Sequence, residues 1–179
     1  MVSAENVVAS GSLGIEIALE AVAHELSKVV DYDPEKYPGA YFRLNDSAPL
    51  ITVYRTGKYI ITGAGSEEEA AGTRSEFLRL LTDHGILSEA EDEWYKIQNY
   101  VCMEDIGQQL DLSALAIGLG LEFTEYEPEQ FPGLVYRPVD HDCVMLLFGS
   151  GKVIITGTKD VVSAEEAVTG LLEEIDDLF

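Results

Sequence analysis

Residues 31–65 read DYDPEKYPGAYFRLNDSAPLITVYRTGKYIITGAG, and residues 125–159 read EYEPEQFPGLVYRPVDHDCVMLLFGSGKVIITGTK. At a constant offset of 94, 13 of these 35 positions are identical. A chain that carries one unit twice is expected to fold with approximate two-fold symmetry and to present the surface of that unit twice. Duplex nucleic acid is the commonest ligand with a matching approximate two-fold.

Length and composition restrict the class of protein. A chain of 179 residues suits one domain or two closely packed half-domains, and 46% hydrophobic residues support a folded core. No uninterrupted apolar run of membrane-spanning length exists, and the start MVSAENVVAS is not a signal sequence. We therefore expect a cytoplasmic protein without a membrane partner. Cys102 and Cys143 lie far apart without CxxC spacing, which is typical of buried thiols in a reducing compartment.

The charge is strongly acidic, with 33 acids against 11 bases and a net charge of −22. An acidic surface mainly serves solubility, but this density favours a cytoplasm of molar salt, where the Debye length is about 3 Å. The composition therefore indicates an extreme halophile, and the strong screening leaves DNA binding possible. Seven of the 11 bases lie in the two repeated segments: Lys36, Arg43, Arg55, Lys58, Arg137, Lys152 and Lys159.

Hydrophobic periodicity predicts the same order of elements in each repeat: a strand, a helix, three antiparallel strands and a second helix. In the first repeat these are expected at 6–9, 15–30, 40–44, 50–54, 58–62 and 66–83. In the second they are expected at 96–103, 112–121, 134–138, 144–148, 152–156 and from 163 onward. Ser66 with Glu69, and Ser163 with Glu166, are predicted to cap the helix that follows each set of strands.

Several predicted strands are apolar on both sides, as in residues 50–54 and 144–148. Such a strand is either buried on both faces or carries an exposed apolar face. Because all predicted helices would pack on one face of the sheet, nothing in the chain remains to cover the other. An exposed apolar sheet predicts a partner surface, and we favour a ligand over an oligomer interface.

Two motifs of the second repeat carry a family resemblance: YEPEQFPGLVYR at 126–137 and LLFGSGKVIITGTK at 146–159. The chain resembles the TATA-box-binding proteins in their archaeal form, over nearly its whole length. The resemblance implies an α+β fold, a pseudo-two-fold duplicated saddle made of a curved antiparallel sheet of about ten strands. Four helices would cover the convex face, and the two repeats would span 1–90 and 91–179 of one intimate domain.

The resemblance also implies a function. Such a protein would bind and bend A·T-rich promoter DNA through the minor groove and act as a general transcription initiation factor. It would recruit transcription factor B and, through it, RNA polymerase, and it would need no cofactor. The family's apolar wedges fall on Phe131 and Phe148, and their first-repeat mates are Tyr37 and Tyr54. Since an unpaired buried hydroxyl costs about 1–3 kcal/mol, we expect a weaker first wedge or one that prefers different base steps.

Further contacts are implied position by position. The amides of Asn6 and Asn99 would donate to base-edge acceptors at the pseudo-dyad. The groove-floor positions are Val8, Val101, Ile60 and Ile154, with Thr62 and Thr156 beside them. The phosphate contacts are Arg43, Lys58, Arg137 and Lys152. Lys159 has Gly65 as its mate, so the first repeat lacks one expected phosphate contact.

The loop residues Glu127, Glu129 and Gln130 match the surface on which this family docks transcription factor B. Taken alone, the two acids are ordinary solvated loop residues. Their mates Asp33 and Glu35 are acidic too, so charge alone does not decide which loop binds.

Other functions find less support in the sequence. The three histidines are dispersed and no glycine-rich phosphate loop follows a strand, so we do not expect an enzyme. The main alternative is a divergent paralogue with weakened DNA binding that acts as a protein-interaction module, for which Tyr37, Tyr54 and Gly65 are the signs. An exposed apolar sheet also makes a homodimer plausible when the protein is free of DNA.

Overall fold

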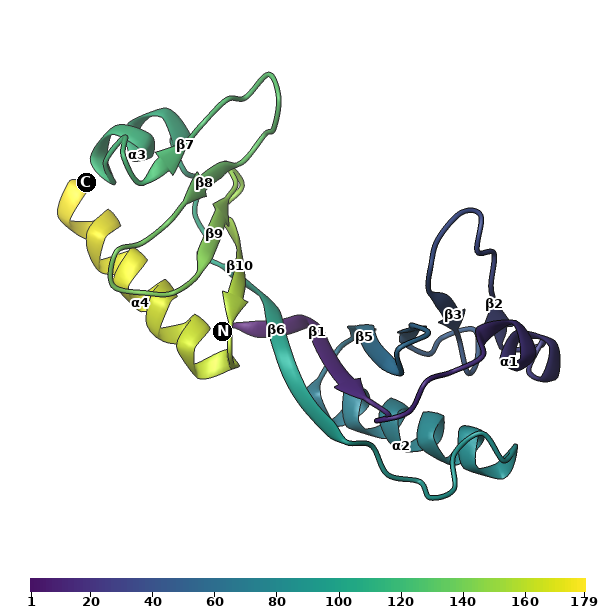
Figure 1. Cartoon of the computed structure of the whole chain (residues 1–179). Coiled ribbons are helices and arrows are strands. Elements are labelled where there is room, and N and C mark those ends of the chain that lie inside the picture. Colours follow the sequence, from purple (N-terminus) through teal and green to yellow (C-terminus); the bar gives the residue numbers. More distant parts are fainter. The chain divides into compact units, whose positions relative to one another are not determined.

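The computed structural model describes residues 1–179 and contains ten strands and four helices (Figure 1). The strands are β1 (Ser3–Ser12), β2 (Val30–Asp31), β3 (Ala40–Phe42), β4 (Leu50–Val53), β5 (Lys58–Ala64), β6 (Trp94–Asp105), β7 (Thr124–Glu125), β8 (Leu134–Tyr136), β9 (Val144–Leu147) and β10 (Lys152–Thr158). The helices are α1 (Leu19–Glu25), α2 (Glu67–Asp83), α3 (Leu112–Gly118) and α4 (Val161–Leu178). The predicted α+β class, with its strands and helices in duplicate, is confirmed.

The strand order repeats the sequence duplication. It runs β2-β3-β4-β5-β1-β6-β10-β9-β8-β7, so the second half mirrors the first. Pairing is antiparallel, and its register is repeated as well. Tyr41 pairs with Thr52 and Thr52 with Ile60, while their mates Val135, Leu146 and Ile154 pair in the same way.

The chain forms two compact units, and the boundaries between them fall within strands β1 and β6 rather than in loops. The first unit is Asn6–Gln98, and the second unit is Met1–Glu5 together with Asn99–Phe179. The amino group of Met1 donates to Glu104 Oε1 at 2.7 Å and so ties the N-terminal segment to the second unit. The compact units therefore differ from the sequence repeats by two short exchanged segments.

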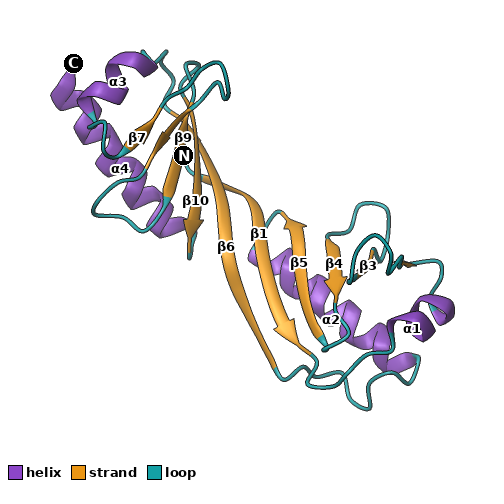
Figure 2. Cartoon of the chain, turned by 45° about the horizontal axis from the view of Figure 1, so that its top comes forward, coloured by secondary structure: helices purple, strands orange, loops and turns teal.

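The core of the first unit lies between its strands and α2 (Figure 2). The buried ring of Phe77 on α2 meets Phe42 at 5.4 Å and Tyr59 at 5.3 Å between ring centroids, both edge to face. The helix begins after Ser66, whose hydroxyl accepts from Glu69 N as predicted. Glu69 Oε2 accepts from Gly65 N at 2.6 Å instead of from Ser66 N, so the reciprocal half of the capping box is displaced by one residue.

The helix α4 covers the strands of the second unit and starts earlier than predicted. Its N-cap is Asp160, whose Oδ1 accepts from Ser163 N at 2.7 Å, so the predicted cap at Ser163 was wrong by three residues. Asp160 is the repeat mate of Ser66, and both halves therefore cap their long helix at the same position. The buried stripe of α4 is Ala164, Ala167, Val168, Leu171 and Ile175.

Two kinds of element boundary differ from the prediction. The helix expected at 15–30 is only Leu19–Glu25, because the chain turns at 26–29 to enter the short edge strand β2. The strand expected at 6–9 continues through Gly11 to Ser12. A Cβ at Gly11 would lie 2.4 Å from Tyr59 Cζ, so this glycine makes room for a core ring and does not end the strand. None of the helices has the length and apolar character needed to cross a membrane.

Candidate functional site

Each unit leaves one face of its strands without a covering helix. Along β5, Tyr59 and Ile61 are fully buried whereas Ile60 and Thr62 are only half-buried. Along β10, Val153 and Ile155 are buried and their neighbours Ile154 and Thr156 are half-buried in the same way. We call the face that carries the half-buried set the open face of each unit. The open face is apolar at its centre yet reachable by a ligand.

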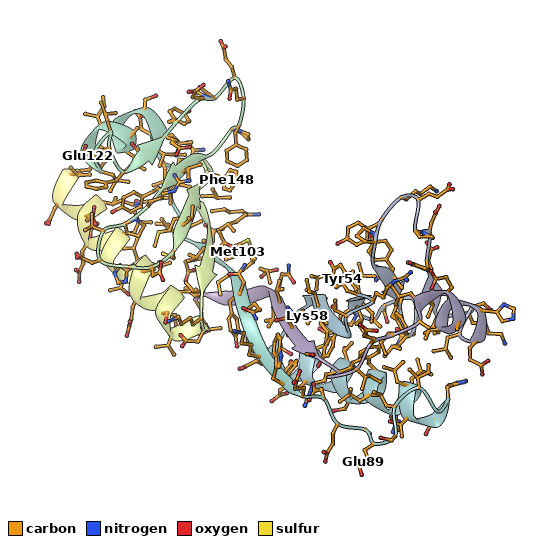
Figure 3. The ribbon with its side chains drawn as sticks, in the orientation of Figure 1. Tyr54, Lys58, Glu89, Met103, Glu122 and Phe148 are labelled. Atoms are coloured by element: carbon orange, nitrogen blue, oxygen red, sulfur yellow. The ribbon has the colours of Figure 1, made fainter.

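A pair of aromatic rings lies at the hairpin end of each open face. The first unit has Tyr37 and Tyr54, with centroids 6.2 Å apart at 60°, and the second has Phe131 and Phe148, 5.9 Å apart at 68°. Tyr54 and Phe148 occupy the same position at the β4–β5 and β9–β10 turns and are labelled in Figure 3. The backbone repeats as well, because Tyr54 N and Phe148 N each donate to the carbonyl of the lysine that opens the next strand at 2.9 Å.

A glycine supports each ring pair. A Cβ at Gly39 would lie 2.9 Å from Tyr37 Cε1 and 3.2 Å from Tyr54 Cε1. At Gly133 the corresponding distances are 2.8 Å to Phe131 Cε1 and 3.1 Å to Phe148 Cε1. The rings therefore lie against the bare backbone of the glycine that directly precedes β3 or β8, and any larger residue there would displace them. This explains why a glycine stands two positions after the first ring in both repeats.

The tyrosine pair differs from the phenylalanine pair in one bond. The hydroxyls of Tyr37 and Tyr54 lie 2.5 Å apart and form a hydrogen bond. This bond, together with burial, raises the pKa of Tyr54 to about 12, so its hydroxyl stays protonated at neutral pH. The ring of Tyr37 also stacks on that of Tyr41, with centroids 5.4 Å apart at an interplanar angle of 8°.

The two asparagines have their amide oxygens occupied by the backbone. Asn6 Oδ1 accepts from Gly63 N at 2.9 Å, and Asn99 Oδ1 accepts from Gly157 N at 2.8 Å. Both glycines have positive φ, +83° and +89°, next to a register shift of the sheet. Since each oxygen is used, each amide presents its Nδ2 group as a donor. Asn99 Nδ2 also reaches Thr156 Oγ1 at 3.3 Å.

The basic candidates surround the open faces and are all exposed. Lys58 and Lys152 open β5 and β10, directly after a positive-φ glycine of each turn. Arg43 donates to the carbonyl of Ala48 at 3.0 Å, whereas its mate Arg137 forms an ion pair with Glu125 at 2.8 Å. The two arginines therefore interact with different partners, although both follow the last residue of equivalent strands.

The two proline loops differ in how their acids are paired. Asp33 forms an ion pair with Lys36 at 3.5 Å and accepts from Glu35 N at 3.1 Å. In the second loop the mate of Lys36 is Gln130, and neither Glu127 nor Glu129 has an ion-pair partner. The second loop therefore exposes two uncompensated carboxylates.

The sixteen predicted DNA-contacting residues divide evenly between the units, and each of them is half-buried or exposed. Sequence reasoning missed the other side chains that share the open face. These are Ser10, Tyr41, Thr52, Met103, Val135 and Leu146, which pair directly with Ile60 or Ile154 or with a partner of these. The alternation of each strand, counted from Ile60 or Ile154, would have identified them. No group of three or more metal-ligating side chains is placed to hold a metal ion.

Comparison with known proteins gives consistent matches. The family model described as transcription factor TFIID (or TATA-binding protein, TBP) matches residues 1–84 and 94–178. TATA-box-binding protein C of Halobacterium salinarum is 48% identical over 97% of this chain and 96% of its own length. TATA-box-binding protein of Haloarcula marismortui is 47% identical over 97% and 92%. The solved structure of Methanococcus jannaschii TBP superposes with a TM-score of 0.86 at 43% identity and covers 98% of each chain.

Proposed function

Because the chain belongs to the family of TATA-box-binding proteins, which are non-enzymatic transcription initiation factors, we propose that its open face binds A·T-rich promoter DNA in the minor groove and bends it. One observation carries this proposal. Each unit repeats the same ligand-accessible apolar face, bordered by a ring pair and by exposed basic residues. We further propose that this takes place in the cytoplasm of an archaeal cell, at its DNA.

The chemistry of the open face fits a minor groove rich in A·T pairs. That groove presents only acceptors, adenine N3 and thymine O2, so Asn6 and Asn99 would donate to them through Nδ2. Ile60 and Ile154 would lie against the groove floor, where few polar groups need a partner. The ring pairs would insert between base steps and kink the duplex. Lys58 and Lys152, with the two arginines, would contact phosphates.

The test is the binding of a fluorescent A·T-rich duplex to the full chain in molar KCl, with Phe148→Ala and Tyr54→Ala in parallel. We expect sequence-specific binding that Phe148→Ala weakens by about tenfold or more, since stacking on a base contributes roughly 1–3 kcal/mol. Tyr54→Ala measures what the first ring pair contributes. Equal affinity for A·T-rich and G·C-rich duplexes would contradict the proposal.

We also propose that the loop at 126–133 docks transcription factor B, which in turn recruits RNA polymerase. The support is the pair of uncompensated carboxylates, Glu127 and Glu129, beside the neutral Gln130. A basic partner surface would complement them. Glu129→Lys should reduce assembly of the ternary complex on DNA and leave binary DNA binding intact. Glu35→Lys, at the matched position of the first loop, is the control, and an equal effect of both changes would refute the assignment.

A second candidate function rests on the tyrosine pair. If the bonded hydroxyls of Tyr37 and Tyr54 prevent insertion, the chain would be a paralogue with weakened DNA binding that acts through protein contacts. The apolar open face would then be covered by a second copy of the chain when DNA is absent. Failure to bind any duplex, with or without transcription factor B, would favour this function. Sedimentation of the free protein at molar salt would measure the dimer.

A further inference from the structure

The two open faces differ in polarity at positions that are equivalent in the strand pairing. In the first unit the residues paired across β3, β4, β5 and β1 are Tyr41, Thr52, Ile60 and Ser10. In the second unit the residues paired across β8, β9, β10 and β6 are Val135, Leu146, Ile154 and Met103. The ring pairs divide in the same way, tyrosine in the first unit and phenylalanine in the second. Beside the apolar Ile60, the first open face therefore carries the exposed hydroxyl of Tyr41, the half-buried hydroxyl of Ser10 and the buried hydroxyl of Thr52, whereas the second carries hydrocarbon and a thioether.

The tyrosine pair retains hydrogen-bonding capacity after its internal bond is made. Two hydroxyls have two protons, and one proton is used between Tyr37 and Tyr54. The pair therefore keeps one proton to donate and oxygen lone pairs to accept with. Tyr41, stacked on Tyr37 and 37% exposed, adds another hydroxyl beside them. Phe131 and Phe148 can neither donate nor accept.

This difference corresponds to the one polar distinction that the minor groove offers. A·T and T·A pairs present only acceptors there, whereas a G·C pair adds the 2-amino donor of guanine. A phenylalanine pair that covers this amino group would leave an N–H without a partner, which weakens binding by about 5-fold to 150-fold. A tyrosine oxygen can accept from the same N–H, and its proton can be given to adenine N3 or thymine O2 instead.

We propose that the Tyr37–Tyr54 pair determines sequence specificity: the first unit accepts a G·C pair in the half-site under its rings, whereas the second unit requires A·T pairs there. The inference rests on the proposed minor-groove function. Its consequence is a defined orientation of the chain on the DNA. A promoter with a G·C pair in one half-site is bound with the tyrosine unit over that half-site, so the asymmetry of the chain becomes the asymmetry of the complex.

Measurements of DNA-binding affinity are sufficient to test this proposal. Three A·T-rich duplexes of equal length are compared: one without G·C pairs, one with a G·C pair in a single half-site, and one with a G·C pair in both. The G·C pair is placed at each outer position of the half-site in turn. We expect the single substitution to weaken binding by no more than about threefold, of which about twofold is the loss of one of two orientations. The double substitution should weaken it by about tenfold or more. Inosine in place of guanine, which lacks the 2-amino group, should restore binding.

Matched variants assign the effect to the hydroxyls. Relative to its own affinity for the all-A·T duplex, the double variant Tyr37→Phe/Tyr54→Phe should lose about tenfold on the singly substituted duplex. The reciprocal variant Phe131→Tyr/Phe148→Tyr should tolerate the doubly substituted duplex. Binding of the all-A·T duplex confirms that each variant is folded.

Two results would overturn the inference. One is a loss of about tenfold for the wild-type chain on the singly substituted duplex, and the other is unchanged tolerance in Tyr37→Phe/Tyr54→Phe. Failure of the wild-type chain to bind the all-A·T duplex would instead refute the proposed function itself.

Discussion

At the scale of single residues, two glycines control the geometry of the candidate site. The backbones of Gly39 and Gly133 lie against the ring pairs, and a methyl group at either position would collide with both rings. The added Cβ would also lie 2.9 Å from the side-chain Cγ2 of Thr52 at position 39, and 3.2 Å from the backbone carbonyl of Leu147 at position 133. The rings cannot both keep their place if either glycine gains a side chain.

We therefore predict that Gly133→Ala weakens DNA binding by about tenfold, because the displaced rings no longer stack on bases. Gly39→Ala should have a smaller effect if the phenylalanine pair is the stronger wedge. Equilibrium titration of a promoter duplex measures both. The control is Gly72→Ala in α2, where an added Cβ meets nothing within 4 Å. It should leave DNA affinity unchanged and, as a helix substitution, raise stability by about 0.5–1 kcal/mol.

The asparagines give a second prediction at this scale. Asn99→Asp keeps the oxygen that accepts from Gly157 N but replaces the donor group by an anionic oxygen. Affinity for A·T-rich DNA should fall by at least about tenfold, since the new carboxylate faces base-edge acceptors. Thermal unfolding should change little. Asn45→Asp is the matched control, because Asn45 Oδ1 also accepts a backbone N–H, from Ser47, in an exposed loop. Equal losses in both variants would argue against a role for the Asn99 amide.

At the scale of elements, an ion pair holds the connection between the repeats. Asp92 accepts from Arg74 Nε at 2.7 Å and from the Tyr59 hydroxyl at 2.5 Å, and its side chain is only 4% exposed. Arg74 lies on α2 and also covers the ring of Tyr95 at 4.6 Å. The network fixes the segment before β6 to the helix and to the core. The second unit has no counterpart, because the mates of Tyr59 and Arg74 are Val153 and Val168.

The pKa of Asp92 gives this network a pH dependence. Burial raises that pKa, but the hydrogen bonds from Arg74 and Tyr59 and the charge of Arg74 outweigh burial and hold it below its usual value. A carboxyl group with a lowered folded-state pKa stabilises the fold above its unfolded pKa, near 4, and loses this contribution as the pH falls through the folded value. Asp92→Asn should lower the free energy of unfolding by about 2–3 kcal/mol at pH 7.

Denaturant unfolding at pH 7 and at pH 3 would check this prediction. The gap between wild type and Asp92→Asn should narrow at the lower pH, because pH 3 lies below the unfolded pKa and the carboxyl then takes up a proton in the unfolded state. Glu91→Gln, an exposed neighbour, should show little difference from wild type at either pH. A gap that is the same at both values would mean that the charge of Asp92 does not stabilise the fold.

At the scale of the whole molecule, the net charge of −22 should change the salt dependence of DNA binding. Basic DNA-binding proteins release counterions and bind more weakly as salt rises. Here acids beside the DNA would take up cations, so we predict that affinity holds or increases with KCl. Arg137, paired with Glu125, is one place where this would occur.

A salt series of binding constants up to molar KCl tests this prediction. Glu125→Gln should shift the slope of log affinity against log salt by about one toward counterion release. Glu122→Gln, nearby and outside any ion pair, is the control. A steep fall of affinity between moderate and molar KCl would show that the acids near the DNA take up no cations.

Much of the architecture was predictable because the residues shared by the two repeats act on the backbone next to them. The Pro-Gly after each ring and the Gly-Lys after each turn set the same hairpins in both halves, so the mirrored strand order follows from the duplication. Strands that are apolar on both sides, together with helices that were all expected on one face of the sheet, predicted one covered and one open face. Helix ends were less predictable. The cap at Asp160 and the short α1 depend on where the following chain turns, which periodicity does not report.

The sequence by itself thus determined the duplicated order of strands and helices and the hairpins of each half, since these depend on neighbours a few residues apart. Only the tertiary structure decided the bond between Tyr37 and Tyr54, the anchoring of Asn6 and Asn99 by distant glycines, and the Asp92 network. Each of these joins atoms from segments 17 to 58 residues apart in the chain. Their geometry depends on strand register and helix placement, which are settled only when the whole core packs.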